Sequence, residues 1–113
     1  MGMAGVSVYS ATKAAVRSLA RSFTPELRKY DARINVLSPG PIDNEFLTNS
    51  GFLSEEEDKA MCNSLGKPLA AGRMGTNEEM APVALFLASD DSSYMFGAEI
   101  QADGGMNQTR WVN

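Results

Sequence analysis

The stretch VYSATKAAVRSLARSFTPELRKY, residues 8–30, carries the clearest structural pattern of this chain. Its apolar side chains recur at the spacings of one face of an amphipathic helix. The arginines at positions 17, 21 and 28 fall largely off that face, where they would form a solvated surface. The pattern predicts one long helix over residues 7–30, which Pro25 should bend or loosen in its last turns. The apolar positions are Val8, Ala15, Val16, Leu19, Phe23, Leu27 and Tyr30.

Two short segments downstream are typical of β-strands. Residues 33–38, RINVLS, are rich in β-branched side chains and stop at a Pro39-Gly40 turn. Residues 98–102, AEIQA, are followed at once by Asp103-Gly104-Gly105, which would close a second strand.

The segment between these strands contains two capping boxes. Ser54 with Glu57 predicts a short helix that runs to about Ser64, inside the loop and lid segment 39–75. Thr76 with Glu79 predicts a second helix over residues 76–89.

Helices that alternate with short strands indicate an α/β fold with a parallel sheet. Two strands are too few for a stable parallel sheet, because such sheets are normally buried on both faces. We therefore expect residues 1–113 to form a single partial domain, whose strands either complete a larger sheet or associate with another chain.

Composition excludes several classes of function. The net charge of −4 argues against nucleic-acid binding, and no apolar run approaches the length of a membrane span. The chain has no His, which excludes a Ser–His–Asp hydrolase and a His-ligated metal site. Cys62 is the single cysteine, which suits a reducing cytoplasm. We expect a cytoplasmic protein with no metal site, in which Cys62 is a packed apolar group rather than a nucleophile.

Tyr9 and Lys13 lie four residues apart, so the predicted helix places both on one face, one turn apart. A phenol ordinarily titrates at about 10, and a neighbouring ammonium group favours the phenolate. Such a pair can serve as a general acid and base for a carbonyl or an alcohol. The same spacing is also common in simple surface contacts. Small residues around the pair would leave room for a cofactor.

The chain resembles the short-chain dehydrogenase/reductase family from about Val6 to Met106. The resemblance rests on several motifs in family order and spacing. They are Tyr9-x-x-x-Lys13, Asn35-Val36 with Pro39-Gly40-x-Ile42, Gly72-Arg73, Thr76-x-Glu78-Glu79, Phe86-Leu87-Ala88-Ser89-Asp90 and Asp103-Gly104-Gly105.

This resemblance implies an NAD(P)-dependent oxidoreductase that transfers hydride between an alcohol and a ketone. Tyr9 would be the catalytic acid/base, and Lys13 would bind the nicotinamide ribose. Ile42 would meet the nicotinamide carboxamide through its backbone, held by the Pro39-Gly40-Pro41 turn. Family members usually carry Thr at the position of Asn44, which can still hydrogen-bond the cofactor. The sequence leaves the choice between NAD and NADP open.

The same resemblance assigns a substrate lid to about Asp43–Leu65. Its larger apolar residues either line a substrate pocket or pack the lid against the body of the protein. They are Phe46, Leu47, Phe52 and Met61. Gly72-Arg73 and the helix after Thr76 are expected to be structural, and Tyr94 and Trp111 to serve packing or an oligomer contact.

Parts of the family pattern are absent from these residues. The glycine-rich turn that binds the dinucleotide is missing, and the catalytic Ser would precede Met1. Ser7 and Ser10 are too close to Tyr9 to replace it, and Asn35 is a strand residue rather than the catalytic Asn. The fold is therefore expected to be the C-terminal part of a doubly wound, Rossmann-type parallel sheet that lacks its N-terminal cofactor-binding half.

The interpretation from sequence is a fragment of such an enzyme, inactive alone, whose substrate is a small alcohol or carbonyl compound. Two alternatives remain: a non-catalytic module that binds other subunits, and one half of a split enzyme. A homo-oligomer is expected, through the 7–30 helix and the 76–102 helix and strand, because the resemblance places the family's subunit interfaces there.

Overall fold

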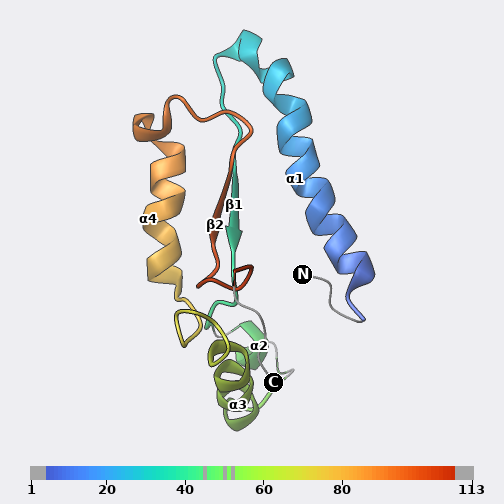
Figure 1. Ribbon diagram of the computed structural model, residues 1–113, viewed down its shortest axis with the longest axis vertical. Helices are drawn as coiled ribbons and strands as arrows, with labels where there is room; N and C mark the ends of the chain where they lie inside the picture. The colour runs from blue at the N-terminus through green and yellow to red at the C-terminus, as the bar shows by residue number, and fades with distance from the viewer. Residues whose placement is uncertain (1–4, 45, 50, 52, 109–113) are drawn as a thin grey trace. The chain divides into compact units, whose positions relative to one another are not determined.

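A computed structural model describes residues 5–44, 46–49, 51 and 53–108 of the chain. Helices alternate with strands along it, which confirms the α/β class (Figure 1). None of the helices in these residues is long and apolar enough to cross a membrane. The elements are α1 (Ser7–Leu27), a 3-10 helix (Arg28–Tyr30), β1 (Val36–Pro39), α2 (Phe46–Asn49), α3 (Glu55–Gly66), α4 (Asn77–Ala88), a second 3-10 helix (Asp90–Ser92) and β2 (Glu99–Ala102).

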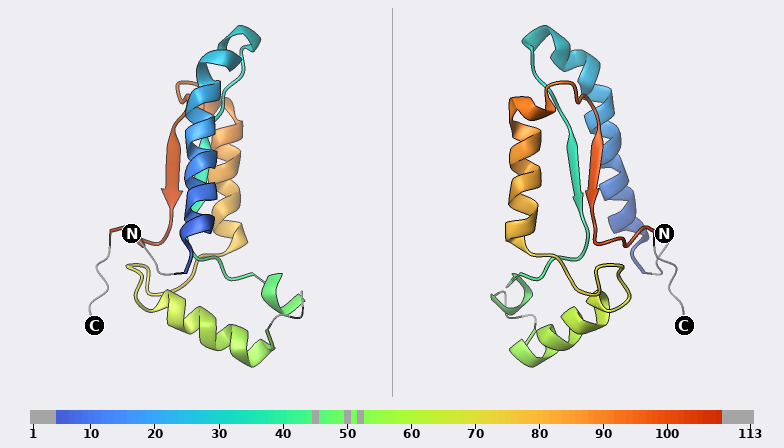
Figure 2. Two further views of the ribbon diagram at one scale, coloured as in Figure 1. Left: turned by 90° about the vertical axis from the view of Figure 1, so that its right-hand side faces the viewer. Right: turned by 60° about the vertical axis from the view of Figure 1, so that its left-hand side comes forward.

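The two strands pair with each other in a two-stranded sheet. The Val36 N–H donates to the Ala98 carbonyl at 2.8 Å, and the Gly40 N–H donates to the Ala102 carbonyl at 3.0 Å. Because the residue numbers of both partners rise together, the strands are parallel. Figure 2 shows the two arrows side by side and pointing the same way.

The chain divides into two compact units. The first consists of Met1–Leu37 and Phe86–Ile100, and the second consists of Ser38–Leu85 and Gln101–Asn113. Tyr9 and Lys13 belong to the first unit. The segment from Pro39 to Asn44 belongs to the second.

Helix α1 of the first unit occupies most of the predicted span 7–30. Its α-helical part ends at Leu27, two residues after Pro25, and a 3-10 turn continues to Tyr30. Asp31 then adopts a left-handed conformation with φ of 52°, and its N–H donates to the Arg28 carbonyl at 3.2 Å. The α-helical hydrogen bonding thus ends soon after Pro25 and a 3-10 turn replaces it, which agrees with the expected effect of Pro25 on the last turns.

Strand β1 begins at Val36, three residues later than the predicted span 33–38, and it ends on Pro39. Just before Val36 the backbone ladder is interrupted, because the Ala98 N–H donates to the Asn35 side chain rather than to a backbone carbonyl. The guanidinium of Arg33 donates to the Ser89 carbonyl at 2.8 Å and to the hydroxyl of the buried Ser92 at 2.7 Å. The Asn35 amide donates to the Met95 carbonyl at 3.0 Å and accepts from the Ala98 N–H at 3.0 Å.

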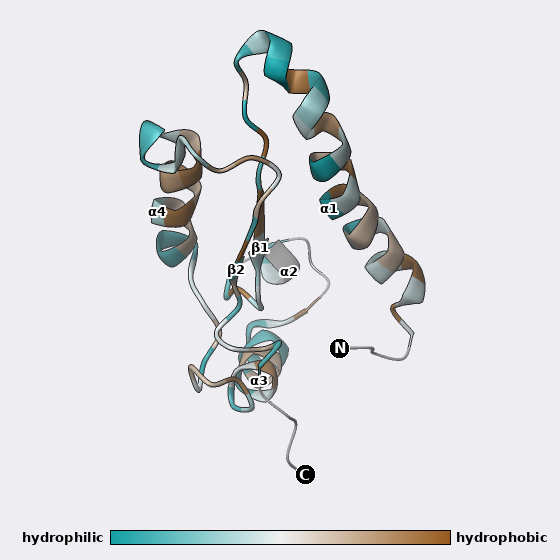
Figure 3. Ribbon diagram, turned by 45° about the horizontal axis from the view of Figure 1, so that its top comes forward, coloured by the Kyte–Doolittle hydropathy of each residue, from teal (hydrophilic) through white to brown (hydrophobic). Residues whose placement is uncertain are grey.

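The apolar face of α1 is largely exposed in this chain. Val8 is 77% exposed, Val16 is 55% exposed and Leu19 is 50% exposed. Ala20 is the one residue of α1 that is buried. Figure 3 shows the corresponding apolar patches along the helix. The face that the periodicity predicts therefore exists, but the described part of the first unit buries it only in part.

The lid segment of the second unit contains one helix that the sequence predicts and one that it does not. Helix α3 begins after Ser54, whose hydroxyl accepts from the Glu57 N–H while the Glu57 carboxylate accepts from the Ser54 N–H, so this capping box is confirmed. Helix α2 (Phe46–Asn49) lies where only loop was expected. Helix α4 and strand β2 lie within one residue of their predicted spans, 76–89 and 98–102.

Candidate active site

Tyr9 and Lys13 lie together near the start of α1, as their spacing predicts. The Lys13 Nζ atom lies 5.4 Å from the centre of the Tyr9 ring, and the Tyr9 side chain is exposed. The Thr12 hydroxyl donates to the Tyr9 carbonyl at 2.7 Å, which adds a side-chain bond to the first turns of the helix. The arrangement presents a phenol and an ammonium group side by side on an accessible surface.

The segment Pro39–Asp43 is held between two other segments of the second unit. On one side, the Gly40 N–H donates to the Ala102 carbonyl, and Gly40 lies so close to Asp103 that a Cβ atom would be 2.6 Å from the Asp103 Cα atom. On the other side, Ile42 forms a parallel bridge with Gly75. The turn that the resemblance assigns to the cofactor is therefore braced along both edges.

The bridge between Ile42 and Gly75 determines which backbone groups of Ile42 remain available. The Gly75 N–H donates to the Pro41 carbonyl at 3.0 Å, and the Asp43 N–H donates to the Gly75 carbonyl at 2.8 Å. Since Gly75 bonds the residues on either side of Ile42, the N–H and C=O of Ile42 itself are directed away from Gly75. Such a donor and acceptor pair matches the two groups of a carboxamide.

Asp103 stabilises the turn that follows β2 and lies next to Gly40. One carboxylate oxygen of Asp103 accepts from the Gly105 N–H at 2.9 Å, and the other accepts from the Asn107 N–H at 3.1 Å. The side chain is buried, so these bonds replace the water it has lost. Asp103 is therefore a structural support for the turn.

Arg73 and Glu79 form a two-pronged ion pair near Gly75. The Nη2 atom of Arg73 lies 2.7 Å from Glu79 Oε1, and its Nη1 atom lies 2.9 Å from Glu79 Oε2. The Thr76 N–H also donates to Glu79 Oε2 at 3.0 Å, which is the half of the predicted second capping box in which the Glu79 carboxylate accepts from the backbone of Thr76. The hydrogen bond from Arg73 and then that from Thr76 lower the pKa of Glu79 to about 2. A cavity of about 330 Å³ in the second unit is lined by both side chains and by Pro41 and Ile42.

Several known proteins are similar to this chain over nearly its whole length. The family model for enoyl-(acyl carrier protein) reductases matches residues 1–107. The oxidoreductase asL5 of Sarocladium schorii is 46% identical over 107 residues, which are 95% of this chain and 41% of that protein. The crystal structure of a short-chain dehydrogenase/reductase from Caenorhabditis elegans superposes with a TM-score of 0.87 at 29% identity, covering 98% of this chain and 42% of that one. The chain belongs to the short-chain dehydrogenase/reductase family.

Other family members give the same picture. The 3-oxoacyl-(acyl-carrier-protein) reductase MabA of Mycobacterium tuberculosis is 38% identical over 93% of this chain and 40% of that protein. The structure of levodione reductase superposes with a TM-score of 0.78 at 33% identity, covering 93% of this chain and 41% of that one. The chain thus spans about two fifths of the length of these relatives and holds part of their Rossmann-type fold.

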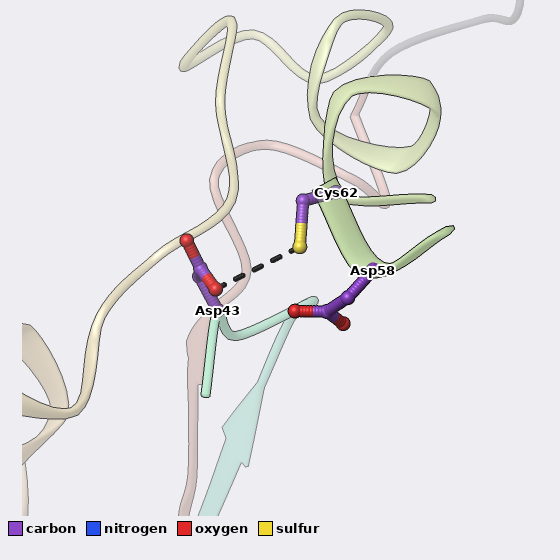
Figure 4. Close-up of side chains that lie close together, drawn as sticks. All are labelled: Asp43, Asp58 and Cys62. Atoms are coloured by element: carbon purple, nitrogen blue, oxygen red, sulfur yellow. Dashed lines mark hydrogen bonds between the residues drawn. The ribbon is translucent and has the colours of Figure 1, made fainter. Parts of the chain in front are cut away.

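The structure brings together three side chains that the sequence does not predict to be neighbours. Ligand atoms of Asp43, Asp58 and Cys62 lie within 4.8 Å of one another, and the Cys62 thiol donates to Asp43 at 3.7 Å (Figure 4). Partial burial raises the pKa of the Cys62 thiol, and the carboxylates of Asp43 and Asp58 raise it further. These effects lower the fraction of thiolate, which is the form of cysteine that reacts as a nucleophile. Exposed acidic groups often gather without a cation, so this cluster alone assigns no metal.

The remaining sequence assignments concern apolar residues. Met61 of the expected lid is half-buried on α3, whereas Tyr94 is 97% exposed, so within this chain Tyr94 does not serve packing. Phe52 and Trp111 lie outside the described residues, as do the side chains of Phe46 and Leu47. Asn44 is exposed next to the braced segment.

Proposed function

We propose that this chain is the Tyr-Lys part of an NAD(P)-dependent oxidoreductase that interconverts an alcohol and a ketone. The observation that carries the proposal is the Tyr9–Lys13 pair on the first turns of α1, in a chain whose relatives are oxidoreductases. In this reading the Tyr9 hydroxyl donates a proton to the substrate oxygen during reduction and takes it back during oxidation. The nicotinamide cofactor, when bound, supplies or accepts the hydride.

The cofactor contacts proposed here lie on two segments. Lys13 would bind the nicotinamide ribose. The N–H and C=O of Ile42, directed away from Gly75, would pair with the carboxamide, and the Asn44 side chain would add a further hydrogen bond. Pro39 and Gly40 hold the turn that carries these groups. Taken by itself, the braced segment of the second unit carries a donor and an acceptor that suit a carboxamide, and Lys13 of the first unit carries a donor that suits a ribose hydroxyl.

We also propose that these 113 residues alone bind the whole dinucleotide weakly and turn over no substrate. The glycine-rich turn that cradles the pyrophosphate in this family is absent from the sequence, and so is the family's catalytic Ser. Positioning and stabilisation of the developing charge on the substrate oxygen would both be lost, and each normally supplies a large part of the rate.

The test is the binding of nicotinamide mononucleotide, which lacks the adenosine half. Lys13→Ala should weaken its binding by at least about tenfold, the effect of losing a charge-assisted hydrogen bond. Lys29→Ala is the matched control, because the Lys29 Nζ atom lies 4.8 Å from the ring centre of Tyr30 in a similar pair at the other end of the helical segment. Equal losses in both variants, or no binding by the wild-type chain, would contradict the proposal.

A second candidate is a non-catalytic module that binds other subunits, and the exposed face of α1 favours it. Val8, Val16 and Leu19 are each at least half exposed, and burial against a second copy would remove that apolar area from water. We propose a homo-oligomer through α1 and through the α4–β2 part of the chain. Light scattering distinguishes this association from a monodisperse monomer. If the chain associates and does not bind nicotinamide mononucleotide, this candidate or one half of a split enzyme is favoured.

A further inference from the structure

The ion pair of Arg73 and Glu79 lies beside Gly75, the residue that forms the parallel bridge with Ile42. Glu79 accepts three hydrogen bonds, two from the Arg73 guanidinium and one from the Thr76 N–H. The Nη1 atom of Arg73 also donates to the Met74 carbonyl at 2.9 Å. The backbone on both sides of Gly75 is thus tied to a single charged pair.

Gly75 in turn holds the backbone on both sides of Ile42. Its N–H and C=O bond Pro41 and Asp43, and its Cα side faces the Ile42 side chain so closely that a Cβ atom would be 3.0 Å from Ile42 Cδ1. A shift of Gly75 would therefore change the direction of the N–H and C=O of Ile42, which lie between the two bonded residues.

We propose that Arg73 and Glu79 are positioning residues for nicotinamide recognition, acting through Gly75 on the backbone of Ile42. This inference rests on the proposed function for the identity of the ligand. Both side chains are exposed, so their pair contributes little to global stability. Their effect is local: the planar fork of Arg73 binds both carboxylate oxygens and the Met74 carbonyl in one fixed geometry, which the compact ammonium group of a lysine does not reproduce.

The experiment measures amide hydrogen exchange in the 113-residue chain without any ligand. In Arg73→Gln and Glu79→Gln, protection of the Gly75 and Asp43 amides should fall by at least about tenfold, as expected for opening of a local unit. The Gly40 amide, which donates to Ala102, should keep its protection. Arg17→Gln is the matched control, since it breaks the ion pair of Arg17 with Glu99, also 2.7 Å long, in the other unit.

The second readout is the affinity for nicotinamide mononucleotide. Arg73→Gln should weaken binding, Arg73→Lys should restore it only in part, and Arg17→Gln should leave it unchanged. Unchanged protection of Gly75 and Asp43, or an equal loss at Gly40, would overturn the positioning role. A different outcome is that the variants lose protection at Gly75 and Asp43 as expected but the wild-type chain does not bind the mononucleotide. That outcome would overturn the proposed function and the identity of the ligand.

Discussion

At the scale of single residues, Gly40 is a position where the structure tolerates little change. Its backbone approaches Asp103 so closely that any side chain would meet main-chain atoms, which cannot move aside as the end of a side chain can. The sequence indicates a turn at Pro39-Gly40 but not this contact, because Asp103 lies far along the chain and only folding brings it near.

Gly40→Ala should lower the free energy of unfolding by about 1–3 kcal/mol, the usual cost of forcing extra atoms into a packed site. Gly75→Ala is the comparison, because its Cβ atom would meet only the flexible end of Ile42 at 3.0 Å. Urea denaturation of both variants measures the difference. A larger loss in Gly75→Ala would contradict the close approach of Gly40 to Asp103.

Cys62 provides a second prediction at this scale. Since Asp43 raises the pKa of its thiol both by charge and by a hydrogen bond, Asp43→Asn should increase the fraction of thiolate and the rate of alkylation near neutral pH. Asp58 acts by charge alone, so Asp58→Asn should increase the rate less. The rates with iodoacetamide over a pH series measure this order, and a faster reaction in Asp58→Asn would refute it.

At the scale of elements, the sequence predicts features that depend on neighbouring residues, and it does not predict those that depend on contacts between distant residues. The capping box of Ser54 and Glu57 lies within one turn of chain, so the start of α3 could be predicted. The start of β1 could not, because the Asn35 side chain accepts from the N–H of Ala98, 63 positions away, in place of a backbone carbonyl. Arg73 is expected from the sequence to be structural, and the link proposed above between Arg73 and Ile42 depends on the position of Gly75 beside Ile42, which the sequence does not show.

The start of α4 should show a specific dependence on pH. The pKa of Glu79 is lowered from its ordinary value of 4.5 to about 2, so its ionised form adds a stabilisation, which is small because the pair with Arg73 is exposed. That stabilisation is complete above about pH 4.5 and is lost as the pH falls toward 2. The stability difference between the wild-type chain and Glu79→Gln should therefore shrink over this range in denaturation experiments. Arg73→Gln should abolish most of this pH dependence, and an unchanged profile in that variant would contradict the assignment.

At the scale of the whole molecule, the sequence predicts the family and the α/β class because its motifs keep their order over nearly the full chain. The resemblance also supplies the roles proposed for Tyr9, Lys13 and Ile42. The degree of exposure of the α1 face does not follow from periodicity, which shows that a helix has an apolar face but not what covers it. This exposed face is the physical reason to expect association.

The most direct test of the central claim is to map by NMR which backbone amides respond to nicotinamide mononucleotide. The chain is expected to show shifts centred on Ile42 and Asn44, and adenosine monophosphate should leave these amides unchanged. The turn of Pro39–Asp43 presents a donor and an acceptor that suit a carboxamide, and adenosine monophosphate has no carboxamide. Unchanged amides at Ile42 and Asn44, or equal shifts with both nucleotides, would contradict the assignment of this chain to nicotinamide-dependent oxidoreduction.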